Sequence, residues 1–148
     1  MKSTEGTIGR IFILRLEDTD IVPDCIEHFA AEKGVHVGHV ILVGGVGKGE
    51  VVCGPRNSEE MPPDPILLPV EGVHEAAEVG MLAPDEEGEP VLHIHAVLGR
   101  AGQSLSGCLR PGVETWLVGE VIIYEILGTN VKRLMDEKSG FKLLEVLQ

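Results

Sequence analysis

The segment that decides the fold is PVLHIHAVLGRAGQSLSGCLRPG, residues 90–112. Apolar side chains alternate with other residues on both sides of a central Arg-Ala-Gly-Gln, which is the period-two pattern of strands with one buried face. Gly102 can adopt a positive φ, so a tight turn is predicted at residues 100–103. We therefore predict a β-hairpin with one face in the core and the other face outside it.

The register of this hairpin determines which side chains face each other. A turn centred between Ala101 and Gly102 places Cys108 directly opposite His95. Side chains in such opposed positions have Cβ atoms about 4.5–5.5 Å apart, and His93 follows two residues along the same face. A turn one residue longer or shorter, without a bulge, would send Cys108 to the core face.

His93, His95 and Cys108 are therefore candidate ligands of one metal ion. Imidazole and thiolate groups are typical ligands of zinc, and three protein ligands with an open fourth position are typical of catalytic zinc sites. The alternative is that two solvated histidines and a small thiol share a hairpin without binding a metal. The residues alone leave both interpretations open.

Length, composition and charge limit the class of protein. A chain of 148 residues is long enough for one domain, predicted to span residues 1–148. Hydrophobic residues make up 43% of the chain but aromatic residues only 3%, so we expect an aliphatic core. The formal net charge of −12, with no basic run, disfavours binding to DNA phosphates.

We predict a cytoplasmic location, because the sequence shows no recognisable targeting signal and its cysteines are typical of a reducing compartment. The apolar run at residues 11–14 is short and lies between two arginines, so no signal peptide is predicted. No segment approaches the roughly 20 apolar residues of a membrane span. The three cysteines are far apart and odd in number, which is typical of reduced thiols.

The rest of the chain predicts an α+β fold, with a mixed, largely antiparallel sheet of about eight strands and one main helix. Outside the hairpin, strands are expected at residues 8–16, 35–43, 50–54, 66–70, 73–82, 115–126 and 141–146. The first of these is apolar on both faces, which predicts a central strand. The helix is expected to begin at a capping Asp20 and to end at Gly34.

Two other segments carry predictions of their own. Residues 44–49, GGVGKG, differ from a phosphate-binding loop because Lys48 is followed by glycine rather than by Ser or Thr and a helix. A flexible turn is predicted there. Residues 130–138 are predicted to form a short helical turn.

Glu120 is a candidate catalytic residue. It is a charged side chain within the apolar run at residues 116–124, and charges in such runs are usually paired, or lie at an interface or a functional site. The alternative is a glutamate that faces solvent or a partner subunit.

Three segments resemble the PPC domain, a family named for its occurrence in plants and prokaryotes. The family pattern Pro-x-x-His-x-His is similar to residues 90–95, its Gly-His-Leu-x-x-Gly to residues 107–112, and its Glu-Val-x-Ile to residues 120–123. Residues 10–16 resemble the family's opening strand, so the resemblance spans nearly the whole chain. One departure concerns the site: Cys108 stands where the family usually carries a third histidine.

The resemblance implies further properties. Free-standing prokaryotic members are compact homotrimers, whereas plant members join the domain to AT hooks and act in gene regulation. This chain has no Arg-Gly-Arg-Pro core of an AT hook. Glu75 lies close to where the family carries a glutamate, which makes it a second catalytic candidate.

Three functional hypotheses follow. The first is a non-enzymatic, homotrimeric regulatory or binding domain with a zinc site and a DNA-associated role that only the family implies. The second is a zinc-dependent hydrolase that acts on an unknown small molecule, with Glu120 or Glu75 as general base. The third is a structural trimer whose histidines line an interface.

Overall fold

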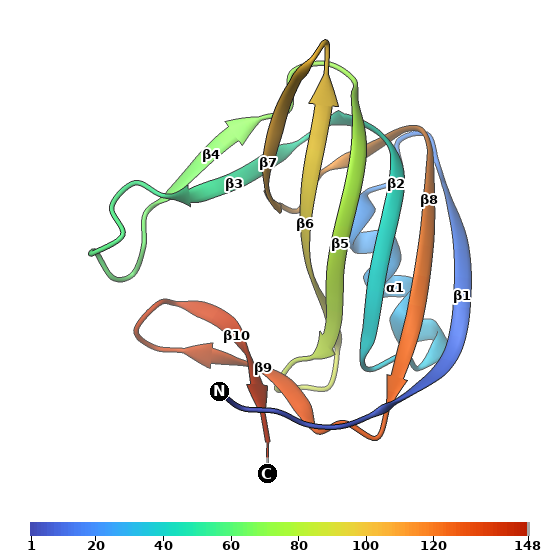
Figure 1. Ribbon diagram of the computed structural model, residues 1–148, viewed down its shortest axis with the longest axis vertical. Coiled ribbons are helices and arrows are strands. Elements are labelled where there is room, and N and C mark those ends of the chain that lie inside the picture. The colour runs from blue at the N-terminus through green and yellow to red at the C-terminus, as the bar shows by residue number, and fades with distance from the viewer. Residues whose placement is uncertain (148) are drawn as a thin grey trace.

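The structure is a computed structural model that describes residues 1–147. It is dominated by an eight-stranded antiparallel sheet that curves around one helix (Figure 1). The strand order is β1-β8-β2-β5-β6-β7-β3-β4, and β9 and β10 form a separate hairpin. The elements are β1 Thr7–Glu17, α1 Val22–Lys33, β2 Gly38–Lys48, β3 Glu50–Pro55, β4 Pro65–Pro69, β5 His74–Pro84, β6 Pro90–Arg100, β7 Gln103–Leu109, β8 Glu114–Leu127, β9 Val131–Asp136 and β10 Phe141–Val146.

The architecture is more strongly β than the predicted α+β fold. The single main helix is confirmed within residues 1–147, and the sheet there pairs only antiparallel strands, so no part of it is mixed. The predicted helical turn at residues 130–138 is wrong, because β9 occupies most of it and pairs with β10. Within the described residues, no helix is long and apolar enough to cross a membrane.

The core lies between α1 and the inner face of the sheet. From the helix it takes Val22, Ile26 and Ala30, which are buried on one side. The predicted capping role of Asp20 is wrong: Ile21 occupies the N-cap without a side-chain hydrogen bond, and the Asp20 carboxylate instead accepts from the Glu17 backbone N–H at 2.8 Å. Gly34 ends the helix in the left-handed conformation, as predicted.

The outer face of the sheet carries exposed aliphatic side chains. Ile13 on β1 is 81% exposed, and Val79 on β5 and Val97 on β6 are 56% and 54% exposed. The prediction that β1 is a central strand is therefore wrong. β1 is an edge strand of the sheet, and one of its two apolar faces packs in the core while the other is uncovered. The outer face of the sheet therefore carries an apolar surface that no other part of the described chain covers.

Gly44, Gly45 and Gly47 belong to strand β2 rather than to a flexible turn, and only Gly49 lies between β2 and β3. A Cβ atom on Gly45 would lie 2.5 Å from the Trp116 carbonyl oxygen of β8. The pairing of β2 with β8 shifts register between Gly44 and Gly45. Glycine is therefore required there for close approach of the two backbones.

The β6–β7 hairpin has the predicted register. Arg100 pairs with Gln103, and the ladder continues to His95 opposite Cys108. The turn residues Ala101 and Gly102 have φ values of 51° and 78°, as a two-residue type I′ turn requires. The hairpin thus fixes which side chains share the outer face of β6 and β7.

Candidate metal centre

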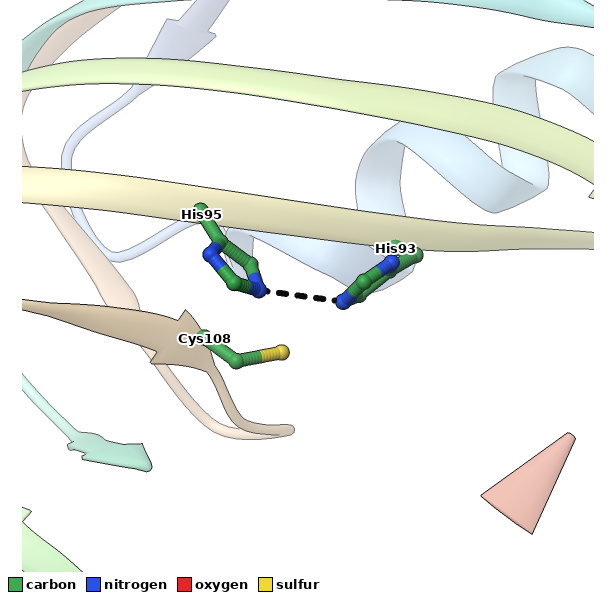
Figure 2. A group of neighbouring side chains, drawn as sticks. All are labelled: His93, His95 and Cys108. Carbon is green, nitrogen blue, oxygen red and sulfur yellow. Dashed lines mark hydrogen bonds between the residues drawn. The ribbon is translucent and has the colours of Figure 1, made fainter. Parts of the chain in front are cut away.

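His93, His95 and Cys108 converge on the outer face of the β6–β7 hairpin (Figure 2). Their potential ligand atoms all lie within 4.8 Å of one another. The two Nε2 atoms of the histidines are 3.1 Å apart, and the rings are nearly perpendicular at 86°. Strand alternation explains the arrangement, because His93 and His95 are two residues apart and Cys108 is directly opposite His95.

This donor set fits a zinc ion. Two imidazole nitrogens bound at about 2.0–2.1 Å in a tetrahedral site would be separated by about 3.3 Å, close to the observed spacing of the Nε2 atoms. A thiolate completes a set of borderline-soft ligands, which zinc prefers over the oxygen ligands of calcium or magnesium. Three protein ligands leave one coordination position for water or another molecule.

The surroundings of the ligands influence their protonation. Desolvation lowers the pKa of His93, with further contributions from the positive charges of Arg133 and of His95. The neutral imidazole, which is the form that binds a metal, is thereby favoured. Desolvation raises the pKa of Cys108, while Arg110 and Arg133 oppose that rise. Metal binding would therefore displace the thiol proton.

Two side chains from other elements hold β6 beside the ligands. The Glu27 carboxylate of α1 accepts a hydrogen bond from the Leu92 backbone N–H at 2.7 Å. Arg133 of β9 is buried and donates from Nη2 to the Met81 carbonyl and from Nε to the Val91 carbonyl, at 2.9 and 3.2 Å. Sequence reasoning missed both residues. Arg133 would have stood out had the period-two pattern of residues 131–136 been recognised.

The two glutamates proposed as catalytic residues do not join the three ligands. Glu120 is exposed on β8, opposite Arg15 of β1 and Val43 of β2, and both β2 and β5 separate its strand from β6. Glu75 is exposed on β5 and pairs with Gly99, four residues along β6 from His95. The structure therefore places neither carboxylate beside the ligands.

A different glutamate is buried in the core. Glu78 of β5 is 1% exposed and lies opposite Leu42 and Ala96, and neither of its carboxylate oxygens has a hydrogen-bond partner within residues 1–147. Desolvation raises its pKa to about 8, so the carboxyl group is largely neutral at pH 7. Because its neighbour Val79 faces the outer side with His95, Glu78 points away from the metal ligands.

Comparisons with known proteins agree with the fold. A metal-containing protein from Archaeoglobus fulgidus superimposes with a TM-score of 0.84 at 26% identity, covering 100% of both chains. A plant- and prokaryote-conserved (PPC) protein from Pyrococcus horikoshii gives 0.84 at 23% identity, covering 100% of this chain and 99% of the other. A proposed DNA-binding protein from Bacteroides thetaiotaomicron gives 0.79 at 16% identity, covering 95% and 97%.

The family is shown by the sequence itself. No curated protein matches the chain in sequence. The profile of the Plants and Prokaryotes Conserved (PCC) domain, however, matches residues 3–127, which include the helix, the eight strands of the main sheet and all three candidate ligands. This chain therefore belongs to the Plants and Prokaryotes Conserved domain family, abbreviated PCC or PPC.

Proposed function

We propose that this protein is a non-enzymatic, homotrimeric binding module of the PPC type, with a zinc ion held by His93, His95 and Cys108. The observation that carries the proposal is the convergence of two imidazole nitrogens and one thiol sulfur within 4.8 Å on one hairpin. The similarity to a metal-containing protein at 26% identity over the full length supports it.

The position of the carboxylates supports a binding role rather than hydrolysis. A zinc hydrolase needs a general base within hydrogen-bonding reach of the metal-bound water. Glu75 and Glu120 lie elsewhere on the outer face, and Glu78 faces the core on the opposite side of the sheet. Within residues 1–147 no carboxylate joins the cluster of three ligands, and the Glu27 carboxylate, which lies nearby, is engaged with the Leu92 backbone N–H.

The apolar outer face supports self-association. Ile13 is 81% exposed, and four further aliphatic side chains lie on the same outer face with 49–58% exposure: Ile11, Val43, Val79 and Val97. A surface of this kind is typically covered by another protein molecule. A trimer is the assembly that the family resemblance implies.

A DNA-associated role rests on the family resemblance alone. Two structural neighbours are proposed DNA-binding proteins, at 16% and 18% identity, and similarity at this level supports the fold alone. The net charge of −12 opposes binding to a phosphate backbone. Binding to duplex DNA that strengthens steeply as salt is lowered would establish such a role, and its absence would limit the function to binding of metal and partner.

Elemental analysis of untagged protein, purified under reducing conditions, tests the metal site. We expect about one zinc per chain in the wild type, and loss of that zinc in His93→Ala and in Cys108→Ser. Cys53→Ser is a matched control, because Cys53 is also a half-buried free thiol but lies outside the ligand cluster. Wild-type protein that is folded yet binds no zinc, even after incubation with the metal, would refute the site.

Sedimentation measurements test the assembly. The chain mass is 15.9 kDa, so a trimer would sediment with three times that mass. Ile13→Lys should dissociate the assembly if the outer face forms the interface. Met61→Lys, at a 51% exposed position in the loop between β3 and β4, should leave the assembly intact. A monomeric wild type would contradict the proposed trimer.

A further inference from the structure

Two arginines flank the candidate metal centre, although the chain as a whole is strongly acidic. Arg133 belongs to β9, which follows the main sheet in sequence, and Arg110 immediately follows β7. The chain contains 12 basic and 24 acidic residues. Two arginines near the same three candidate ligands are therefore unexpected from the overall composition. Their placement requires a local explanation.

Arg133 is held firmly in place beside His93. Its side chain is buried, and two of its nitrogens donate to backbone carbonyls: Nη2 to Met81, which pairs with His93, and Nε to Val91, two residues before His93. The remaining nitrogen, Nη1, has no hydrogen-bond partner within residues 1–147. The guanidinium therefore keeps donor capacity in a fixed orientation.

Arg110 directly follows β7, the strand that carries the ligand Cys108. Its backbone N–H donates to the Glu50 carbonyl at 3.2 Å, which anchors the residue, while its side chain is exposed. Arg110 lies two residues after Cys108, and the positive charges of Arg110 and Arg133 both act on the Cys108 thiol.

The charge at the site is positive once a metal is bound. Zinc with one thiolate and two neutral imidazoles carries a net charge of +1, and the two arginines add to it. Glu27 is the carboxylate whose charge acts on Arg133, but it is already engaged with the Leu92 backbone N–H. A guanidinium presents its N–H groups in a planar fork that matches the oxygens of carboxylate and phosphate.

We propose that the open coordination position takes an oxyanion of a small molecule, a carboxylate or a phosphate group, whose remaining oxygens are bound by Arg133 and Arg110. This inference rests on the proposed metal site and names the class of ligand that the site would bind. Binding of the anion would require both the metal, which supplies the coordination position, and the arginines, which supply the hydrogen bonds.

Cobalt-substituted protein provides the test, because the visible absorption of Co²⁺ reports directly on its coordination. Acetate and inorganic phosphate are titrated separately into wild type, Arg133→Met and Arg110→Met. The matched control is Arg15→Met, which removes an exposed arginine from β1 at the far edge of the same sheet. Because Arg110 is exposed, its variant keeps the test decisive even if Arg133→Met folds poorly.

We expect a saturable spectral change in the wild type with at least one of the two anions. The anion that produces it distinguishes a carboxylate ligand from a phosphate ligand. Loss of a charge-assisted hydrogen bond should weaken anion binding at least about tenfold in Arg110→Met and Arg133→Met, with cobalt still bound. Arg15→Met should behave as wild type.

Two results would overturn the inference while leaving the metal site intact. One is a cobalt protein whose spectrum responds to neither anion, and the other is anion binding of unchanged affinity in both arginine variants. Failure of the folded wild type to bind cobalt at all would instead refute the proposed metal site, and the anion site with it.

Discussion

The Glu27 carboxylate of α1 accepts a hydrogen bond from the backbone N–H of Leu92 at 2.7 Å, one residue before the first candidate ligand, His93. The ladder between β6 and β7 begins only at His95, so this N–H has no partner from β7. The helix thus completes the hydrogen bonding of β6 where the neighbouring strand ends.

Glu27→Ala should destabilise the protein, because it leaves the Leu92 N–H without its acceptor. The expected loss is about 2 kcal/mol, or roughly 4–8 °C in Tm for a domain of this size. Glu27→Gln keeps an acceptor oxygen and should lose much less. Thermal unfolding of both variants checks this, and equal losses would show that the charge of Glu27 matters rather than its hydrogen bond.

Gly107→Ala should separate β3 from β7. A Cβ atom at this position would collide with the Val52 carbonyl oxygen, and Val52 pairs with Cys108. We expect a loss of about 1–3 kcal/mol in the free energy of unfolding, together with faster amide hydrogen exchange in β3.

Gly99→Ala is the matched control for that substitution. Gly99 lies on β6 of the same hairpin, but the nearest atom to its added Cβ would be the Glu75 carbonyl oxygen at 3.8 Å, an ordinary contact distance. This variant should keep wild-type stability within about 0.5 kcal/mol. A similar loss in both variants would show that the approach of β3 is not what requires Gly107.

Glu78 should make the protein less stable as pH rises from about 5 to 8. Its pKa is about 8 in the folded state, against an ordinary value of 4.5 for glutamate, so over this range the unfolded chain releases the proton before the folded one does. The unfolded state then binds fewer protons, and the free energy of unfolding falls with rising pH.

Glu78→Gln should remove this dependence. The difference in the free energy of unfolding between Glu78→Gln and wild type should shift in favour of the variant with each step in pH from 5 to 8, amounting to a few kcal/mol overall. Any constant cost of burying the amide leaves that slope unaffected. A difference that stays constant with pH would contradict the raised pKa of Glu78.

Cys108→His should retain the metal, because it installs a third imidazole where the family usually carries one. Cys108→Ser should lose the metal, since a neutral hydroxyl is a poor zinc ligand. In the cobalt-loaded protein, Cys108→His should also lose the near-ultraviolet charge-transfer absorption of a cobalt–thiolate bond while the visible bands remain. Persistence of the near-ultraviolet absorption would show that another thiol, not Cys108, binds the metal.

The hairpin could be predicted from sequence because its determinants are local. Alternation on either side of Ala101 and Gly102 fixes both the turn and the register, and so brings Cys108 opposite His95. The edge position of β1 could not be predicted, because an apolar outer face has the same pattern as burial on both sides. The helical turn predicted at residues 130–138 is wrong, and the period-two pattern of the strand found there covers only six residues, 131–136.

The supporting residues were missed for a different reason. Glu27 and Leu92 are 65 residues apart, and Arg133 lies 42 residues from Val91, so no local pattern connects them. Sequence reasoning favoured Glu120 and Glu75 because of their charge and their resemblance to family positions. Only the strand order shows that β2 and β5 separate Glu120 from the ligands.

The two-residue turn of the β6–β7 hairpin also has a kinetic consequence. All three candidate ligands lie within residues 93–108. The pairing of β1 with β8, in contrast, joins residues more than a hundred positions apart in sequence, such as Ile11 and Tyr124. Contacts between residues near in sequence form faster than distant ones, because less chain entropy is lost in closing the loop. Capture of a metal by the proposed site would therefore require only the closure of one short hairpin, and we expect an ion present during synthesis to bind before the slow, long-range strands of the sheet have assembled.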